Sequence, residues 1–164
     1  MNNELEISAI PATSRYFEDY TVGMVSQFGH VVVKQSDILD FALRFDPQPF
    51  HTDPEAAKRS PYGGIIASGW HTGAMMMRLL VENYLSPVAS LGSPGVDELR
   101  WTRPVRPGDV LSVRVTVTDS KRSKTKPDRG LVHLYIEVLN QRSEAVMSLK
   151  AMVFMLCRPV QKLS

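Results

Sequence analysis

The second half of the chain alternates hydrophobic and polar residues, which is typical of strands that bury one face. In LSVRVTVT (111–118), Leu and Val alternate with Ser, Arg and Thr, so one face is apolar and the other polar. Strand patterns continue in LVHLYIEVL (131–139) and in VMSLKAMVFMLC (146–157). We therefore expect roughly four antiparallel strands after residue 94, joined by short loops.

Helical spacing dominates the first half, after one Val-rich strand near residues 25–33. A first helix is predicted from Ser36, as its N-cap, to the stretch FDPQPFHTDP (45–54), because apolar residues recur at helical spacing there: Ile38, Phe41, Ala42 and Phe45. Three prolines in 45–54 predict rigid, irregular chain. A second helix is predicted to begin at Asp53-Pro54-Glu55, with Asp53 as the cap.

The segment IIASGWHTGAMMMRLLVENYL (65–85) has no wide polar stripe, which predicts a helix buried on most sides. A membrane span is the alternative, and the polar residues within the segment argue against it: Ser68, His71, Thr72, Arg78 and Glu82. The order of elements predicts one α+β domain in which an antiparallel sheet wraps around this helix. Because one small sheet gives such a helix limited cover, we expect a dimer.

Composition narrows the class of protein further. The chain has 164 residues, which suits one domain, and a net charge of only +2, which does not call for nucleic acid. The single cysteine, Cys157, excludes an intramolecular disulfide and, with four scattered histidines, does not form a zinc motif. The N-terminus lacks a secretion-signal pattern, so we expect a cytoplasmic protein with a loosely ordered arm at 1–15 and one domain at 16–164.

Candidate chemistry lies in the proline-rich stretch. Asp46 and His51 are five residues apart on chain that proline stiffens, just before the glycine-bearing segment GGIIASGW. Each has an ordinary structural explanation, Asp46 as a helix-end residue and His51 as a hydrogen-bonded loop residue. However, an acid–base pair beside free N–H groups at a helix start is what carbonyl chemistry requires.

Three motifs in order resemble the MaoC-like family of (R)-specific enoyl-CoA hydratases and dehydratases. DPQPFHTDP is similar to the family's hydratase motif, Asp-x-Asn-Pro-(aliphatic)-His-x-Asp, and GGIIASGW to the glycine segment that follows it. ELRWTRPVRPGDVLSVRV resembles the later strand signature, aromatic-x-x-Pro-Val-x-x-Gly-Asp. The resemblance spans 17–157, with two departures: Gln48 replaces Asn, and Phe50 replaces the aliphatic residue.

The resemblance implies a hot-dog fold, a homodimer and an acyl-CoA substrate, with no cofactor besides the coenzyme A of that substrate. It implies a lyase of fatty acid metabolism that interconverts trans-2-enoyl-CoA and (R)-3-hydroxyacyl-CoA. Asp46 and His51 become the catalytic pair, and the Gly69 N–H polarises the thioester carbonyl. Gln48 and Ser68 join Gly69 as expected oxyanion or substrate-binding residues.

Two other functions fit the sequence. A hot-dog thioesterase would need a carboxylate placed differently and would not need His51, and a non-catalytic acyl-CoA-binding module would leave the Asp46 and His51 pair unexplained. The sequence also offers two groups of cations that could attract the phosphates of coenzyme A, and it does not choose between them. The first group is the loop 119–130, and the second is Arg100, Arg103 and Arg106.

Overall fold

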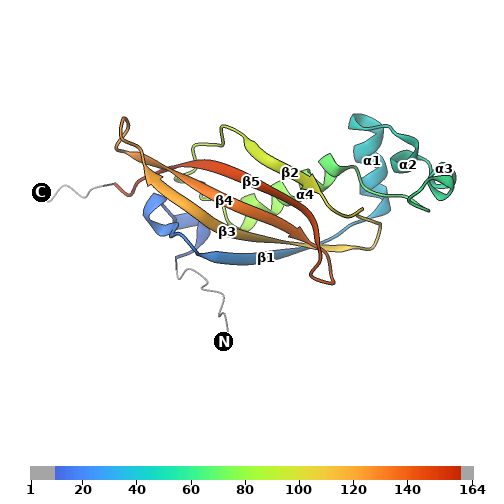
Figure 1. The fold of residues 1–164 in the computed structure, drawn as a ribbon, viewed down its shortest axis with the longest axis horizontal. Helices are drawn as coiled ribbons and strands as arrows, with labels where there is room; N and C mark the ends of the chain where they lie inside the picture. The colour runs from blue at the N-terminus through green and yellow to red at the C-terminus, as the bar shows by residue number, and fades with distance from the viewer. Residues whose placement is uncertain (1–9, 160–164) are drawn as a thin grey trace, which may run out of the picture.

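A computed structural model describes residues 10–159 as an antiparallel sheet packed on one long helix (Figure 1). Residues 1–9 of the expected N-terminal arm lie outside the described residues. After them the chain forms two 3-10 turns, η1 (Ala12–Ser14) and η2 (Phe17–Asp19), before it enters the sheet.

The sheet has five strands in the order β1-β3-β4-β5-β2, and every pairing is antiparallel. The bounds are Val25–Val32 for β1, Val96–Trp101 for β2, Val110–Arg122 for β3, Arg129–Leu139 for β4 and Ala145–Leu156 for β5. The four predicted strands after residue 94 are confirmed, as is the early strand. β1 and β2 are the two edges of the sheet.

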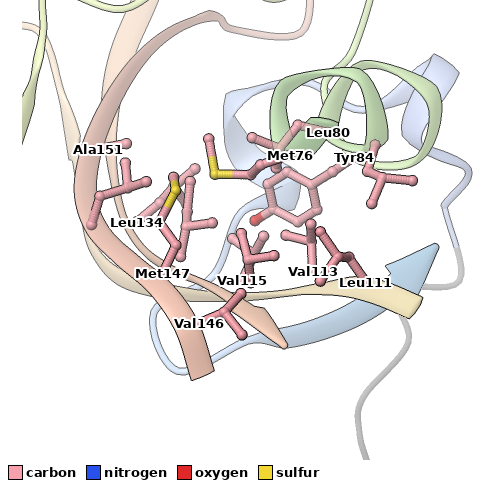
Figure 2. Close-up of a cluster of buried hydrophobic side chains, with 14 of the residues drawn as sticks. Met76, Leu80, Tyr84, Leu111, Val113, Val115, Leu134, Val146, Met147 and Ala151 are labelled. Atoms are coloured by element: carbon pink, nitrogen blue, oxygen red, sulfur yellow. The ribbon is translucent and has the colours of Figure 1, made fainter. Parts of the chain in front are cut away.

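The core lies between the sheet and the helix α4 (Gly69–Asn83), as Figure 2 shows. The period-two pattern places one set of β3 side chains in this core, each almost fully buried: Leu111, Val113, Val115 and Val117. Met76 and Leu80 of α4 and Tyr84 just after it point toward the sheet. Each buried side chain of this size contributes about 1.5–3 kcal/mol. A curved sheet around one helix is the α+β hot-dog arrangement that was predicted.

Three shorter helices lie together beyond one end of the sheet (Figure 1). Helix α1 (Gln35–Phe45) ends where predicted, but its N-cap is Lys34. The prediction of Ser36 as N-cap was wrong, because Ser36 already lies inside the first turn. The 45–54 stretch is also not wholly irregular, since Pro49 begins a short helix α2 (Pro49–Thr52). Proline suits the first position of a helix, where no N–H partner is needed.

Helix α3 (Pro54–Arg59) begins as predicted. The Asp53 carboxylate accepts hydrogen bonds from the N–H groups of Glu55 at 2.8 Å and Ala56 at 3.1 Å. Asp53 therefore has a structural role as a helix cap.

Helix α4 begins at Gly69, later than the apolar segment does, because the Ser68 hydroxyl caps it by accepting from the Trp70 N–H. The prediction that this helix is buried on most sides is wrong for a single chain. Trp70, Met77 and Val81 remain exposed, although Trp70 packs on Trp101 of β2. Among residues 10–159, no helix has the length and apolar character needed to cross a membrane.

Candidate active site

Asp46 and His51 face each other at the junction of α1 and α2. Asp46 is the residue at which α1 ends, and the short helix α2 turns the chain so that His51 points back toward it. The His51 Nε2 lies 3.3 Å from the Asp46 Oδ2. His51 is 4% exposed. The proline-rich stretch therefore brings the two predicted residues into direct contact.

The far side of the His51 ring is held by the backbone. Its Nδ1 lies 2.7 Å from the carbonyl oxygen of Ile66, and this contact requires Nδ1–H to donate. Nε2 is then the ring nitrogen left for proton exchange. Nε2 faces the Asp46 carboxylate at 3.3 Å, so the two groups that can exchange protons lie side by side.

Two side chains donate to the Asp46 carboxylate. Gln48 Nε2 donates to Oδ1 at 2.7 Å, and Ser68 Oγ donates to Oδ2 at 2.7 Å. Partial burial alone raises the pKa of Asp46, but these hydrogen bonds and the nearby charge of His51 outweigh it, so the pKa lies below its ordinary value. Asp46 is therefore held ionised beside the histidine.

Gly69 is the first residue of α4, where N–H groups have no acceptor within the helix. Among residues 10–159, this N–H donates no hydrogen bond. A Cβ on Gly69 would overlap Cε2 of Trp101, so the indole ring packs directly against the glycine. Trp101 also meets Trp70 edge to face, with ring centroids 5.2 Å apart.

A cavity of about 450 Å³ joins these groups, a volume typical of a small-molecule site. All five predicted site residues line it: Asp46, Gln48, His51, Ser68 and Gly69. Further lining residues include Phe50, Tyr62, Thr72, Trp101 and Arg103. Trp101 received no site role from the sequence, although it lies in the later strand motif, and that motif was the available signal. Arg103 was one of several candidate cations for coenzyme A phosphates, and the structure places it on this cavity.

The remaining histidines lie elsewhere. His71 stacks on Phe41 with ring centroids 4.8 Å apart and lines a separate cavity, and burial lowers its pKa. His30 lines the same separate cavity. In the part of the chain that the structure describes, no group of three or more His, Cys, Asp and Glu side chains is arranged to hold a metal ion.

The fold and the site define a hot-dog protein with an acid–base pair at the start of its central helix. The chain belongs to the MaoC-like domain family, whose model matches residues 17–137. This match confirms the resemblance found in the three sequence motifs.

The solved structures that are similar to this one include a dehydratase and an (R)-hydratase. A MaoC-like dehydratase from Rhodospirillum rubrum is 43% identical and has a TM-score of 0.84, with 90% of this chain and 100% of that chain covered. The (R)-hydratase PhaJ1 from Pseudomonas aeruginosa is 25% identical with a TM-score of 0.71, over 91% and 93% of the two chains.

The relatives that are similar in sequence include one uncharacterized protein and one dehydratase. The uncharacterized protein YdeM of Bacillus subtilis is 30% identical over 129 residues, which is 79% of this chain and 90% of that protein. A 3-hydroxybutyryl-CoA dehydratase of Methylorubrum extorquens is 32% identical over 105 residues, which is 63% of this chain and 64% of that protein. The family therefore includes hydratases and dehydratases, which indicates a lyase-type enzyme.

Proposed function

We propose that this protein is an acyl-thioester hydratase or dehydratase that interconverts trans-2-enoyl-CoA and (R)-3-hydroxyacyl-CoA. The observation that carries the proposal is the Asp46–His51 contact on the wall of a cavity. Hydrogen bonds to other parts of the chain fix the orientation of both side chains. The similarity to a dehydratase from R. rubrum, an (R)-hydratase from P. aeruginosa and a 3-hydroxybutyryl-CoA dehydratase from M. extorquens supports the reaction class.

In the hydration direction, one water molecule lies in the cavity within hydrogen-bond distance of both Asp46 and His51. Its oxygen forms a bond to C3, one group of the pair accepts the proton that the water loses, and the pair delivers a proton to C2. Only Nε2 of His51 and the Asp46 carboxylate exchange protons here, because Nδ1 is engaged by Ile66. Dehydration follows the same steps in reverse.

Negative charge develops on the thioester oxygen during this addition. The Gly69 N–H, free at the start of α4, is the proposed donor to that oxygen and supplies about 3 kcal/mol of transition-state stabilisation. Gln48 and Ser68 act in the proposal by orienting the Asp46 carboxylate, which both of them contact.

The lining of the cavity favours this reaction over the two alternatives. Among its described lining residues, Asp46 is the single carboxylate, so the differently placed acid of a thioesterase has no candidate there. A pure binding module has no need for an ionised aspartate 3.3 Å from a buried histidine. The proposal includes a homodimer in the cytoplasm and no cofactor besides the coenzyme A of the substrate.

The test follows two products at once. Purified protein receives short and medium trans-2-enoyl-CoA substrates while absorbance reports the conjugated double bond and a thiol reagent reports free coenzyme A. We expect absorbance loss without thiol release, and a fall in kcat of about 100-fold or more in Asp46→Asn and His51→Ala. Asp53→Asn, a matched change two residues after His51 that lies off the cavity lining, keeps its activity.

Two results contradict the proposal. Thiol release that survives both substitutions indicates a thioesterase, and the absence of turnover across a broad acyl panel indicates a binding module. Circular dichroism and thermal melting of the variants establish that loss of activity does not reflect loss of fold.

A further inference from the structure

Arg103 is the one cation among the described residues that line the catalytic cavity. Its side chain is 54% exposed, whereas the side chains of Asp46 and His51 are 19% and 6% exposed. The cavity therefore runs from a buried acid–base pair to an exposed guanidinium. A ligand with its reacting end at the pair has its other end near Arg103.

The backbone on both sides of Arg103 is tied to the sheet and to the site. Thr102 donates from its N–H to the Val146 carbonyl at 2.9 Å and from its hydroxyl to the Ala145 carbonyl at 2.6 Å. After Arg103, Pro104 restricts the chain, and the Val105 carbonyl accepts from the Ala67 N–H at 2.8 Å. Only the Arg103 side chain is free to adjust to a ligand.

The charge of Arg103 is weakly compensated. Its Nη2 lies 3.7 Å from the Glu144 Oε1, and within residues 10–159 its guanidinium makes no hydrogen bond and no other ion pair. Oε2 of the same carboxylate accepts from Asn140 Nδ2 and from Arg142 Nε, each at 2.9 Å, so Glu144 already has two closer donors than Arg103. The planar fork of Arg103 keeps its donors for an anion, which it binds best in a bidentate manner.

The other candidate cations are less suitable. Arg106 donates to the Tyr62 carbonyl at 2.6 Å and Arg100 to the Leu99 carbonyl at 2.9 Å, and neither lines the cavity. The β3–β4 hairpin lies at the opposite end of the sheet from α1–α3 (Figure 1). Three of its cations are paired, Lys121 with Asp119, Arg122 with Glu18 and Arg129 with Asp128.

We propose that Arg103 binds the phosphate group that follows the pantetheine arm of the acyl carrier. This inference rests on the proposed function, because the thioester site determines which end of the carrier enters the cavity. The phosphate is common to coenzyme A, where it begins the diphosphate, and to acyl carrier protein, where it joins the arm to serine. Its negative charge replaces the distant Glu144 as the partner of Arg103.

Binding without turnover tests this assignment. Isothermal titration with coenzyme A compares the wild type with Arg103→Gln, and we expect affinity about tenfold weaker in the variant. Arg129→Gln removes one cation far from the cavity and leaves affinity within about twofold. Arg103→Lys keeps the charge but loses the planar fork, so its affinity lies between those of the wild type and Arg103→Gln.

Truncated carriers identify the phosphate. Arg103→Gln weakens binding of 4′-phosphopantetheine and dephospho-coenzyme A as much as that of coenzyme A. It leaves unchanged the KM for an enoyl-pantetheine thioester, which has no phosphate. Equal coenzyme A affinity in the wild type and Arg103→Gln overturns the proposal, as does an equal defect with pantetheine. A defect seen only with coenzyme A overturns it in favour of the 3′-phosphate.

These experiments distinguish failure of the Arg103–phosphate proposal from failure of the hydratase proposal. If the protein binds coenzyme A through Arg103 yet turns over no enoyl thioester, the hydratase proposal fails while the phosphate contact stands. If enoyl-pantetheine is hydrated but Arg103→Gln does not affect coenzyme A, the reverse holds.

Discussion

At the scale of single residues, Asp46 is the best-defined feature of the molecule. Gln48 was a departure from the family motif, and the structure shows what its longer side chain does. Its carbonyl accepts the His51 N–H at the start of α2, while its side-chain amide reaches back to Asp46. Phe50, the second departure, lies edge to face with His51 at 4.5 Å between ring centroids and forms a wall of the cavity.

Ser68→Ala is predicted to move the acidic limb of the pH profile of kcat/KM to higher pH. The substitution removes a hydrogen bond that lowers the pKa of Asp46 and leaves its partial burial, which raises the pKa. More acid then stays protonated at a given pH, so activity is lost sooner as pH falls. Ser68→Thr, which keeps a hydroxyl, leaves the limb in place.

Ser68→Ala is also predicted to change how the free energy of unfolding depends on pH. A carboxyl group whose folded pKa is depressed adds stability above its unfolded pKa of about 3.9, and this is lost as pH falls through the folded value. Ser68→Ala reduces that contribution and removes a helix cap worth about 1 kcal/mol. Ser86→Ala, at a buried hydroxyl without a hydrogen-bond partner among residues 10–159, is the matched control. An unshifted acidic limb in Ser68→Ala would show that Ser68 does not set the Asp46 pKa.

At the scale of elements, the contact between β1 and α4 depends on a glycine. The pairing of β1 with β3 shifts register between Phe28 and Val31, and Gly29 within this bulge has a φ of +81°. A Cβ there would lie 2.7 Å from Cδ2 of Leu79 on α4. Gly29 thus permits both the backbone turn and the close approach of the helix.

Gly29→Ala and Gly23→Ala separate these two effects. Gly23 has a φ of +88° and nothing within 4 Å of its Cβ position, so Gly23→Ala adds only backbone strain of about 1 kcal/mol. Gly29→Ala also creates a steric conflict with Leu79, which lowers the free energy of unfolding by a further ~1–3 kcal/mol. Urea denaturation measures both free energies of unfolding. Equal losses would mean that Leu79 moves aside without cost.

At the scale of the whole molecule, one face remains apolar and exposed. Trp70, Met77 and Val81 lie on α4, and Val96 and Trp101 lie on β2, which is an edge strand. Exposed apolar patches of this kind and unpaired strand edges favour association. This surface is where we place the second subunit of the proposed homodimer.

Val81→Asp tests that placement. We expect light scattering after size exclusion to report two chains for the wild type and one for the variant, because the aspartate would be desolvated without a partner. Leu43→Asp on α1 is the control, since Leu43 is 65% exposed and Val81 is 59% exposed. A monomeric wild type, or a dimer that survives Val81→Asp, contradicts this arrangement.

Local interactions account for what the sequence determined by itself. The alternation in 111–118, the helical spacing of 38–45 and the Asp53 cap each depend on neighbours a few residues away, so the strands, α1 and α3 were predictable. The motifs likewise identified Asp46, His51 and Gly69 through the family resemblance. The short helix α2 was not predicted, because three prolines in ten residues indicate irregular chain. Pro49, however, occupies the first position of a helix, where proline is favoured.

Only the tertiary structure decided how the site is assembled. Ser68 reaches Asp46 across 22 residues, Trp101 from β2 covers Gly69 of α4, and Arg103 joins the same cavity. Packing also decided that one face of α4 stays exposed in the single chain. Such contacts depend on where the sheet places distant segments. Residue periodicity reports only local structure, so it does not predict which distant side chains contact one another.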